Sequence, residues 1–161
     1  MGEAQLEPSQ VLSALIGACF GSLGWLFVGL YINQRTTRSA ARSAARAVYF
    51  ELLLNRANVE LAATYGETMP LSRSSYEQLL PQLASLLSAN DLSTVAGAYI
   101  SHVGYEQVRQ GRDHPEDARR AALASILGAQ VAALERLAEV AFTSAERGDL
   151  RLAGDLQPGR D

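Results

Sequence analysis

The sequence predicts an all-α protein with one N-terminal transmembrane helix that continues into a cytoplasmic, antiparallel three- or four-helix bundle. An apolar run without any charged residue occupies residues 11–32, and about 22 helical residues reach about 33 Å, enough to cross the hydrocarbon of a bilayer. After this run, apolar residues recur at helical spacing, and no segment alternates with the period of two that is typical of strands. With 48% hydrophobic residues, the 161-residue chain can bury one compact core.

We expect the apolar run to stay attached to the protein as a membrane span. Residues 1–10 are acidic, whereas a cleaved signal peptide begins with basic residues. The stretch Ile16-Gly17-Ala18-Cys19 resembles a bacterial lipobox, but the residues after Cys19 remain apolar where mature lipoproteins become polar. Cleavage and lipidation at Cys19 are the two alternatives to a retained span.

Four arginines follow the run and predict its orientation. They are spaced three, four and four residues apart, so they share one helical face. By the positive-inside rule, residues 1–10 lie outside the cell and the chain after Ile32 lies in the cytoplasm. All 14 basic residues are arginine and alanine is abundant, which suggests a bacterial gene of high GC content and hence an inner (plasma) membrane. The cluster consists of Arg35, Arg38, Arg42 and Arg46.

This arginine cluster has two interpretations, a topology signal with a solvated face or a site for anionic lipid. The net charge of −3 argues against a nucleic-acid partner. Small residues also recur on one side of the predicted span, and such faces let helices approach closely. Glycine is common in membrane helices in any case, but the face predicts contact with a second copy or with a larger membrane subunit. Its members are Ser13, Gly17, Gly21 and Gly24.

The first helix is expected to run without a break to Tyr65, where Gly66 can end it. Its apolar residues form a stripe at four-three spacing, and further apolar residues, such as Phe50 and Leu54, widen the apolar surface. A helix this apolar is expected to be enclosed. The stripe consists of Ala41, Ala45, Val48, Leu52, Asn55, Val59 and Ala62.

Three further helices are expected in the bundle. Ser74 and Glu77 form a capping box at the start of the second helix, which Pro81 should kink or split. Asn90 or Asp91 should cap the third helix. Asp113 and Pro115 should open a fourth that runs to about Arg147. The predicted organisation is an extracytoplasmic segment 1–10, a span 11–32, a bundle 33–147 and a flexible tail 148–161.

Two polar residues interrupt the apolar stripes, and we expect both in the core. Asn55 lies in the stripe of the first helix and Gln130 in that of the fourth. A side-chain hydrogen bond between them would fix the register of the two helices. Glu51 lies one turn before Asn55, and this pair favours structural hydrogen bonding over a ligand pocket.

Residues for catalysis are scarce in this sequence. It has two histidines, and its single cysteine falls in the predicted span. Di-iron spacing, zinc clusters and glycine-rich phosphate loops are absent from the sequence, so no metal or cofactor is expected. His102 and Glu106 are four residues apart on the third helix and form the one weak ligand candidate, although such a pair is more often an ordinary surface contact.

The order of these features resembles bacterial single-pass membrane-anchored helical proteins of unknown function. The resemblance covers residues 11–110 and rests on "ELLLN", "LSRSSYEQLLPQL" and "AGAYISHV" after the span. It implies no activity. We expect a non-enzymatic scaffold or accessory subunit of a membrane protein complex. The alternative is a signalling protein whose bundle binds a ligand or partner and moves the continuous helix, and a third class is an enzyme that uses His102 and Glu106.

Overall fold

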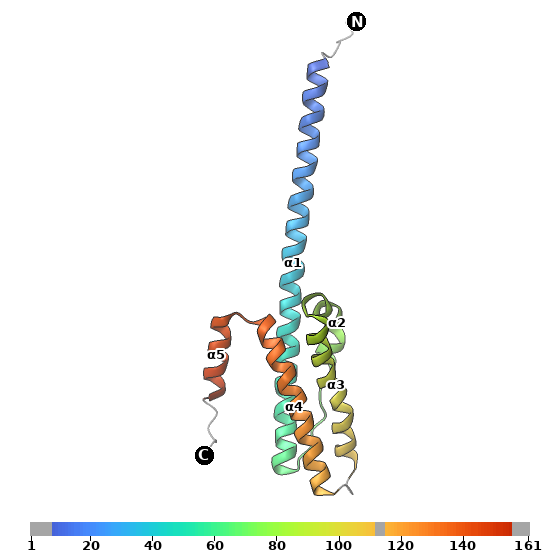
Figure 1. Ribbon diagram of the computed structural model, residues 1–161, viewed down its shortest axis with the longest axis vertical. Coiled ribbons are helices and arrows are strands. Elements are labelled where there is room, and N and C mark those ends of the chain that lie inside the picture. The colour runs from blue at the N-terminus through green and yellow to red at the C-terminus, as the bar shows by residue number, and fades with distance from the viewer. Residues whose placement is uncertain (1–7, 112–114, 156–161) are drawn as a thin grey trace. The chain divides into compact units, whose positions relative to one another are not determined.

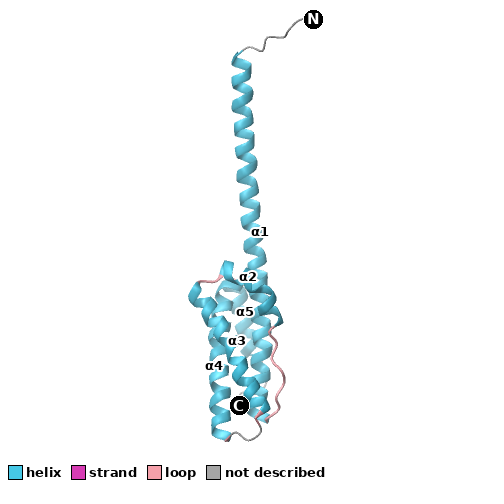
Figure 2. Cartoon of the chain, turned by 90° about the vertical axis from the view of Figure 1, so that its right-hand side faces the viewer, coloured by secondary structure: helices cyan, strands magenta, loops and turns pink. Residues whose placement is uncertain are grey.

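The computed structural model describes residues 8–111 and 115–155, with side chains for Trp25, residues 28–111 and residues 115–150. In these residues the fold is all-α, as the sequence predicts, and Figure 2 shows helices joined by loops. The five helices labelled in Figure 1 are α1 (Pro8–Tyr65), α2 (Ser74–Leu86), α3 (Ala89–Gln110), α4 (Glu116–Ala141) and α5 (Ser144–Asp155).

The chain divides into two units, residues 1–39 and residues 40–161; we call the second the helical module. In the first unit, the backbone of the predicted span, residues 11–32, belongs to α1. The described side chains of this unit, which include Trp25, are exposed. Most side chains of the span lie outside the described residues, so the span stays a prediction. The same holds for the small-residue face of Ser13, Gly17, Gly21 and Gly24.

Among the described residues, one helix, α4, is long and apolar enough to cross a bilayer, with a mean hydropathy of 1.3 over its most apolar 18 residues. However, 33% of this stretch is buried inside the protein. Leu123, Ala133 and Leu137 of α4 are buried in the core, and buried helices of globular domains are as apolar as many spans. We therefore treat α4 as a core helix of the module.

Two clusters of buried side chains hold the helical module together. The first joins α1, α2, α3 and α4, and the second joins α1, α3 and α4. From the first cluster to the second, residue numbers rise along α1 and α3 but fall along α4, so α4 runs antiparallel to the other two. α1 and α3 run parallel because the loop 66–73 and α2 bring the chain back between them (Figure 1). The largest fully buried side chains include Leu52, Leu83, Tyr99, Tyr105, Leu123 and Leu137.

The predicted buried stripe of α1 is confirmed, since every residue from Ala41 to Ala62 in that pattern is at most 2% exposed. The expectation that α1 is enclosed on all sides is wrong. Phe50 is 47% exposed, Leu54 68% and Leu61 40%. The core helices pack on the four-three stripe, and this leaves the opposite face of α1 open.

The end of α1 follows the prediction. Gly66 adopts a φ of 75°, and its amide donates to the carbonyl oxygen of Ala62 at 3.2 Å. Arg119 of α4 donates to the same oxygen at 3.0 Å, so two donors satisfy a carbonyl that the helix leaves open. Pro81 neither splits nor ends α2. It is exposed, so water can bind the carbonyl that loses its intrahelical donor.

The starts of α2 and α3 differ from the prediction. Ser74 does not cap α2; it is the first helical residue, and its hydroxyl bonds another helix instead. The cap of α3 is Ser88, whose hydroxyl accepts from the Asp91 amide at 3.2 Å, so Asn90 and Asp91 lie inside the first turn. The expected cap of α4, Asp113, lies outside the described residues.

The predicted fourth helix is in fact two helices. α4 ends at Ala141, and α5 runs from Ser144 to Asp155, so residues 148–155 are helical rather than a loose tail. A reciprocal capping box causes the break. The Thr143 hydroxyl accepts from the Glu146 amide at 3.3 Å, and the Glu146 carboxylate accepts from the Thr143 amide at 2.7 Å.

Candidate functional site

Glu51 of α1 is the centre of the polar network in the helical module. Its carboxylate accepts from the Ser75 amide at 2.7 Å and the Tyr76 amide at 3.3 Å, both in the first turn of α2. The Ser72 and Ser74 hydroxyls donate to it at 2.9 and 3.1 Å, and the Tyr99 hydroxyl of α3 donates at 2.7 Å. Glu51 therefore supplies the cap that the sequence of α2 does not provide, and it ties α1, α2 and α3 together.

Asn55 lies one turn after Glu51 and fixes the loop before α2. Its amide nitrogen donates to the Ser72 carbonyl oxygen at 2.7 Å, and the Ser72 amide donates to its side-chain oxygen at 2.8 Å. The Asn55 side chain thus offers Ser72 one donor and one acceptor, as the backbone of a paired residue would. The Glu51 and Asn55 spacing thus has the structural role that the sequence favours.

The electrostatics of Glu51 keep it charged. Burial alone would raise the pKa of Glu51, but hydrogen bonds from the Ser75 amide, the Tyr99 and Ser72 hydroxyls and the Tyr76 amide outweigh burial and hold it below its usual 4.5. The N-terminus of α2 also favours a negative charge at this place. Burial, with the adjacent Glu51, raises the pKa of Tyr99 far above its ordinary value, so Tyr99 stays a neutral donor.

His102 faces the core rather than Glu106. It is 3% exposed, its Nε2 lies 3.4 Å from Nε2 of Gln130, and its ring lies 5.0 Å from that of Tyr99. Burial, assisted by the charge of Arg73, lowers the pKa of His102 to about 4. A neutral imidazole and a glutamine amide can bond once tautomer and amide orientation match. Among the described residues, Nδ1 of His102 and Oε1 of Gln130 have no hydrogen-bond partner, although both are buried.

Glu106 binds Arg109 at 2.8 Å, three residues further along α3. His102 belongs to the buried stripe of α3. Glu106 lies beside that stripe, and its carboxylate pairs with Arg109. The structure therefore does not bring the predicted ligand pair together. The predicted bond between Asn55 and Gln130 is also wrong: both are buried, but Asn55 binds Ser72 and Gln130 contacts His102.

The four members of the arginine cluster differ in their exposure and contacts. Arg35, Arg38 and Arg42 are exposed. Arg46 is half-buried: it donates to the Ala141 carbonyl oxygen at 3.0 Å and to Glu146 at 2.8 Å. Its guanidinium also lies 5.2 Å from the centre of the Phe142 ring. Arg46 thus joins the corner between α4 and α5 to α1. The role predicted for the three exposed arginines, in lipid binding or topology, stays a prediction.

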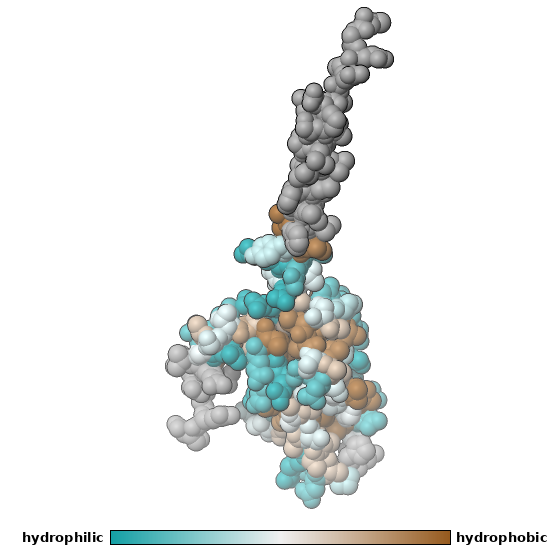
Figure 3. Space-filling model, turned by 45° about the horizontal axis from the view of Figure 1, so that its top comes forward, coloured by the Kyte–Doolittle hydropathy of each residue, from teal (hydrophilic) through white to brown (hydrophobic). Residues whose placement is uncertain are grey.

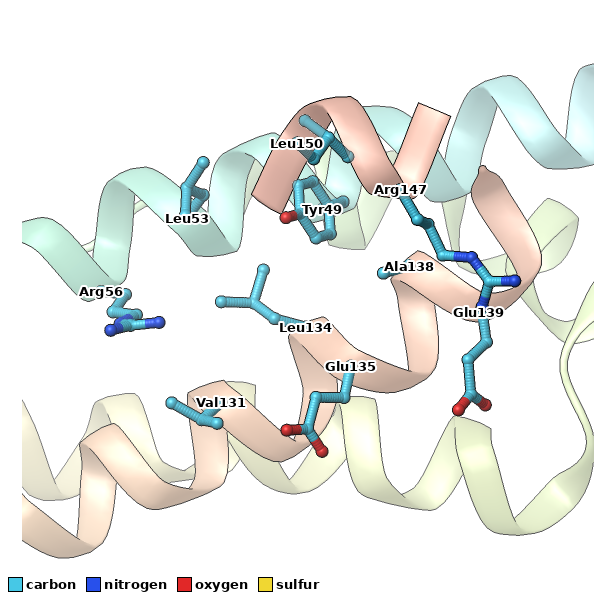
Figure 4. Close-up of a pocket in the computed structure, with 10 residues that line it drawn as sticks. All are labelled: Tyr49, Leu53, Arg56, Val131, Leu134, Glu135, Ala138, Glu139, Arg147 and Leu150. Carbon is cyan, nitrogen blue, oxygen red and sulfur yellow. The ribbon is translucent and has the colours of Figure 1, made fainter. Parts of the chain in front are cut away.

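A pocket of about 410 Å³ lies between α1, α4 and α5. Figure 4 places Arg56 at one end and Arg147 with Glu139 at the other, with Leu134 between them. Such a surface can hold a small amphipathic molecule. The sequence does not predict this pocket, because its pattern indicates the end of a longer helix and a tail where α5 lies. The lining residues are Tyr49, Leu53, Arg56, Val131, Leu134, Glu135, Ala138, Glu139, Arg147 and Leu150.

Comparisons with known proteins add no family to this geometry. No protein-family model, curated protein or solved structure matches the chain. Within the described part of the chain, no group of three or more histidine, cysteine, aspartate or glutamate side chains is placed to hold a metal ion.

Proposed function

We propose that this chain is a non-enzymatic, membrane-anchored helical scaffold or accessory subunit of a membrane protein complex. The observation that carries the proposal is the uncharged run 11–32, which is followed by arginines and belongs to the same helix, α1, as the core stripe of the module. A protein anchored this way would keep residues 1–10 outside a bacterial inner membrane and the helical module in the cytoplasm.

The interior of the module supports a scaffold role. The side chains of Glu51, Asn55 and Tyr99 form hydrogen bonds that join α1 to α2, to α3 and to the loop before α2. Its surface, in contrast, carries large exposed apolar side chains on α1, and Figure 3 shows hydrophobic atoms reaching the surface of the module. Exposed apolar surface of this kind is typical of protein association.

Signalling is the second candidate function, and the pocket between α1, α4 and α5 favours it. A ligand with an anionic group for Arg56 or Arg147 and an apolar body for Leu134 would touch α1 directly. Such a ligand shifts α1 only if the helix has two conformations and the ligand binds one of them more tightly than the other. Identical cross-links along residues 35–60 with and without added ligand would contradict this second function.

Purification of the full chain in mild detergent, followed by native mass measurement, tests the scaffold proposal. We expect a particle heavier than one chain, either a multiple of the chain mass or a complex with a larger membrane protein. A single chain, with reporters fused at Asp161 active only outside the cell, would contradict both the association and the topology.

A further inference from the structure

α1 carries a second apolar stripe on the side away from the core. Its members are spaced three, four, three, four and three residues apart, which is the a and d pattern of a coiled-coil seam. The larger ones are well exposed: Phe50 47%, Leu54 68% and Leu61 40%. We call this the outer stripe: Ala47, Phe50, Leu54, Ala57, Leu61 and Thr64.

The outer stripe has the dimensions of a helix-pairing surface. Its 18 residues span about 27 Å of helix, and Tyr65, 73% exposed, extends it at the end. A heptad seam is shaped to receive another helix with the same repeat, because each side chain fills a hole between four residues of its neighbour. The core helices of the module occupy the opposite face of α1. Within the chain, Phe142 at the corner between α4 and α5 packs against Phe50, with ring centres 6.1 Å apart. The stripe from Leu54 to Thr64 is therefore the part that is open to a helix of another chain.

The charges around the stripe indicate what that chain is. No member of the outer stripe is charged, and at its border Arg56 and Glu60 neutralise each other at 2.7 Å. In a two-fold contact, residues near the axis meet their own copies, so a charge there would repel itself. The charge-free outer stripe meets this requirement of a two-fold contact. We propose that the outer stripe pairs with the outer stripe of a second copy of this chain.

The direction of the pair rests on the proposed function. Two copies anchored in one membrane by the same end run parallel along α1, so Leu54 meets Leu54 of the second copy. One helix pair buries less than the roughly 800 Å² per partner of a standard interface. Confinement in a shared membrane offsets this, because tethering raises the effective concentration of the second copy.

Disulfide trapping in membranes tests the pairing. In the full-length chain with Cys19→Ser, a Leu54→Cys substitution should give a chain dimer on oxidation, since parallel a positions come within the roughly 4.4–6.8 Å between Cα atoms that a disulfide needs. The matched control is Ile100→Cys on α3, because Ile100 is an aliphatic residue that is also 68% exposed. We expect Leu54→Cys to cross-link about tenfold faster or more, because pairing holds this position beside its copy, whereas the shared anchor raises both rates equally.

Equal rates at the two positions, or a Leu54→Cys adduct with a protein of different mass, would overturn the proposal. A cross-link between Phe50→Cys and Leu61→Cys chains without one at Leu54→Cys would show antiparallel pairing and overturn the parallel arrangement. Both positions are exposed, so unchanged helical circular dichroism is expected and checks the fold. Membrane retention without cross-linking contradicts self-pairing alone, whereas a chain that is not retained contradicts the proposed function.

Discussion

Glu51 accepts hydrogen bonds from five groups in the loop before α2, in α2 itself and in α3, and it is only 7% exposed. A buried carboxylate in this position is stabilising only while it stays ionised and fully bonded. Its value to the fold can therefore be measured by removing the charge while keeping the shape.

Replacement of Glu51 by glutamine (Glu51→Gln) should lower the free energy of unfolding by about 2–4 kcal/mol, because hydrogen bonds to a charged acceptor are lost in the interior. Urea denaturation of the full chain in detergent micelles measures the change. The matched control is Glu60→Gln on the same helix, where an exposed ion pair with Arg56 at 2.7 Å is lost and the expected change is below about 0.5 kcal/mol. Equal effects at the two positions would contradict the cap.

His102 predicts a pH dependence of stability. Its pKa falls from the usual 6.5 to about 4 in the folded protein, chiefly through burial. Between these values the unfolded chain binds a proton that the folded chain does not. The contribution of His102 is therefore complete above pH 6.5 and is lost as the pH falls to 4, by about 3 kcal/mol in all. Glu51 adds to the loss at lower pH, because its pKa lies below 4.5.

Urea midpoints measured from pH 7.5 to 4 check this dependence, and His102→Gln should flatten it above pH 5. The unsubstituted chain serves as the control and should show the full slope. A proton resonance of His102 that titrates near 6.5 in the folded protein would show that the ring is not buried and neutral.

For single residues, the sequence predicts which side chains share a helical face better than it predicts which residues they bond. Glu51 and Asn55 are one turn apart in any helix, so their joint structural role could be anticipated. Their partner Ser72 is 17 or more residues away, and no local rule identifies it. His102 and Glu106 share the same spacing, but the buried stripe of α3 takes His102 into the core, and Arg109 is the closer partner of Glu106.

At the scale of helices, the structure shows which sequence signals end or begin a helix. Gly66 ends α1 as expected because only glycine takes a φ of 75° without strain. The Thr143 and Glu146 capping box has the usual three-residue spacing, but the fourth helix predicted from the sequence runs past it to about Arg147. Periodicity also identifies the buried stripe of α1 but not how many neighbours the helix has, so it did not reveal the open outer stripe.

Two glycine substitutions separate a required glycine from a dispensable one. Gly66→Ala should destabilise the module by about 1–2 kcal/mol, because alanine is strained in the left-handed region. Gly97→Ala should instead stabilise it by up to about 1 kcal/mol, since Gly97 is inside α3 and an added methyl group meets nothing within 4 Å. Thermal unfolding of both variants should shift the melting temperature in opposite directions, and a shift in the same direction would contradict the role given to Gly66.

At the scale of the whole molecule, the all-α class and the core of the module follow from sequence periodicity, whereas the membrane placement rests on composition alone. The uncharged run 11–32 is favourable in lipid because no side chain in it carries the roughly 3 kcal/mol insertion cost of a charge. Scaffold, signalling and self-pairing proposals all assume that this run is retained and inserted.

Membrane fractionation of cells that make the full chain tests this central assumption most directly. After an alkaline wash that strips peripheral proteins, we predict that the full-length chain stays in the membrane pellet and leaves it only with detergent. Recovery of a folded, full-length chain in the soluble fraction without detergent would contradict the account.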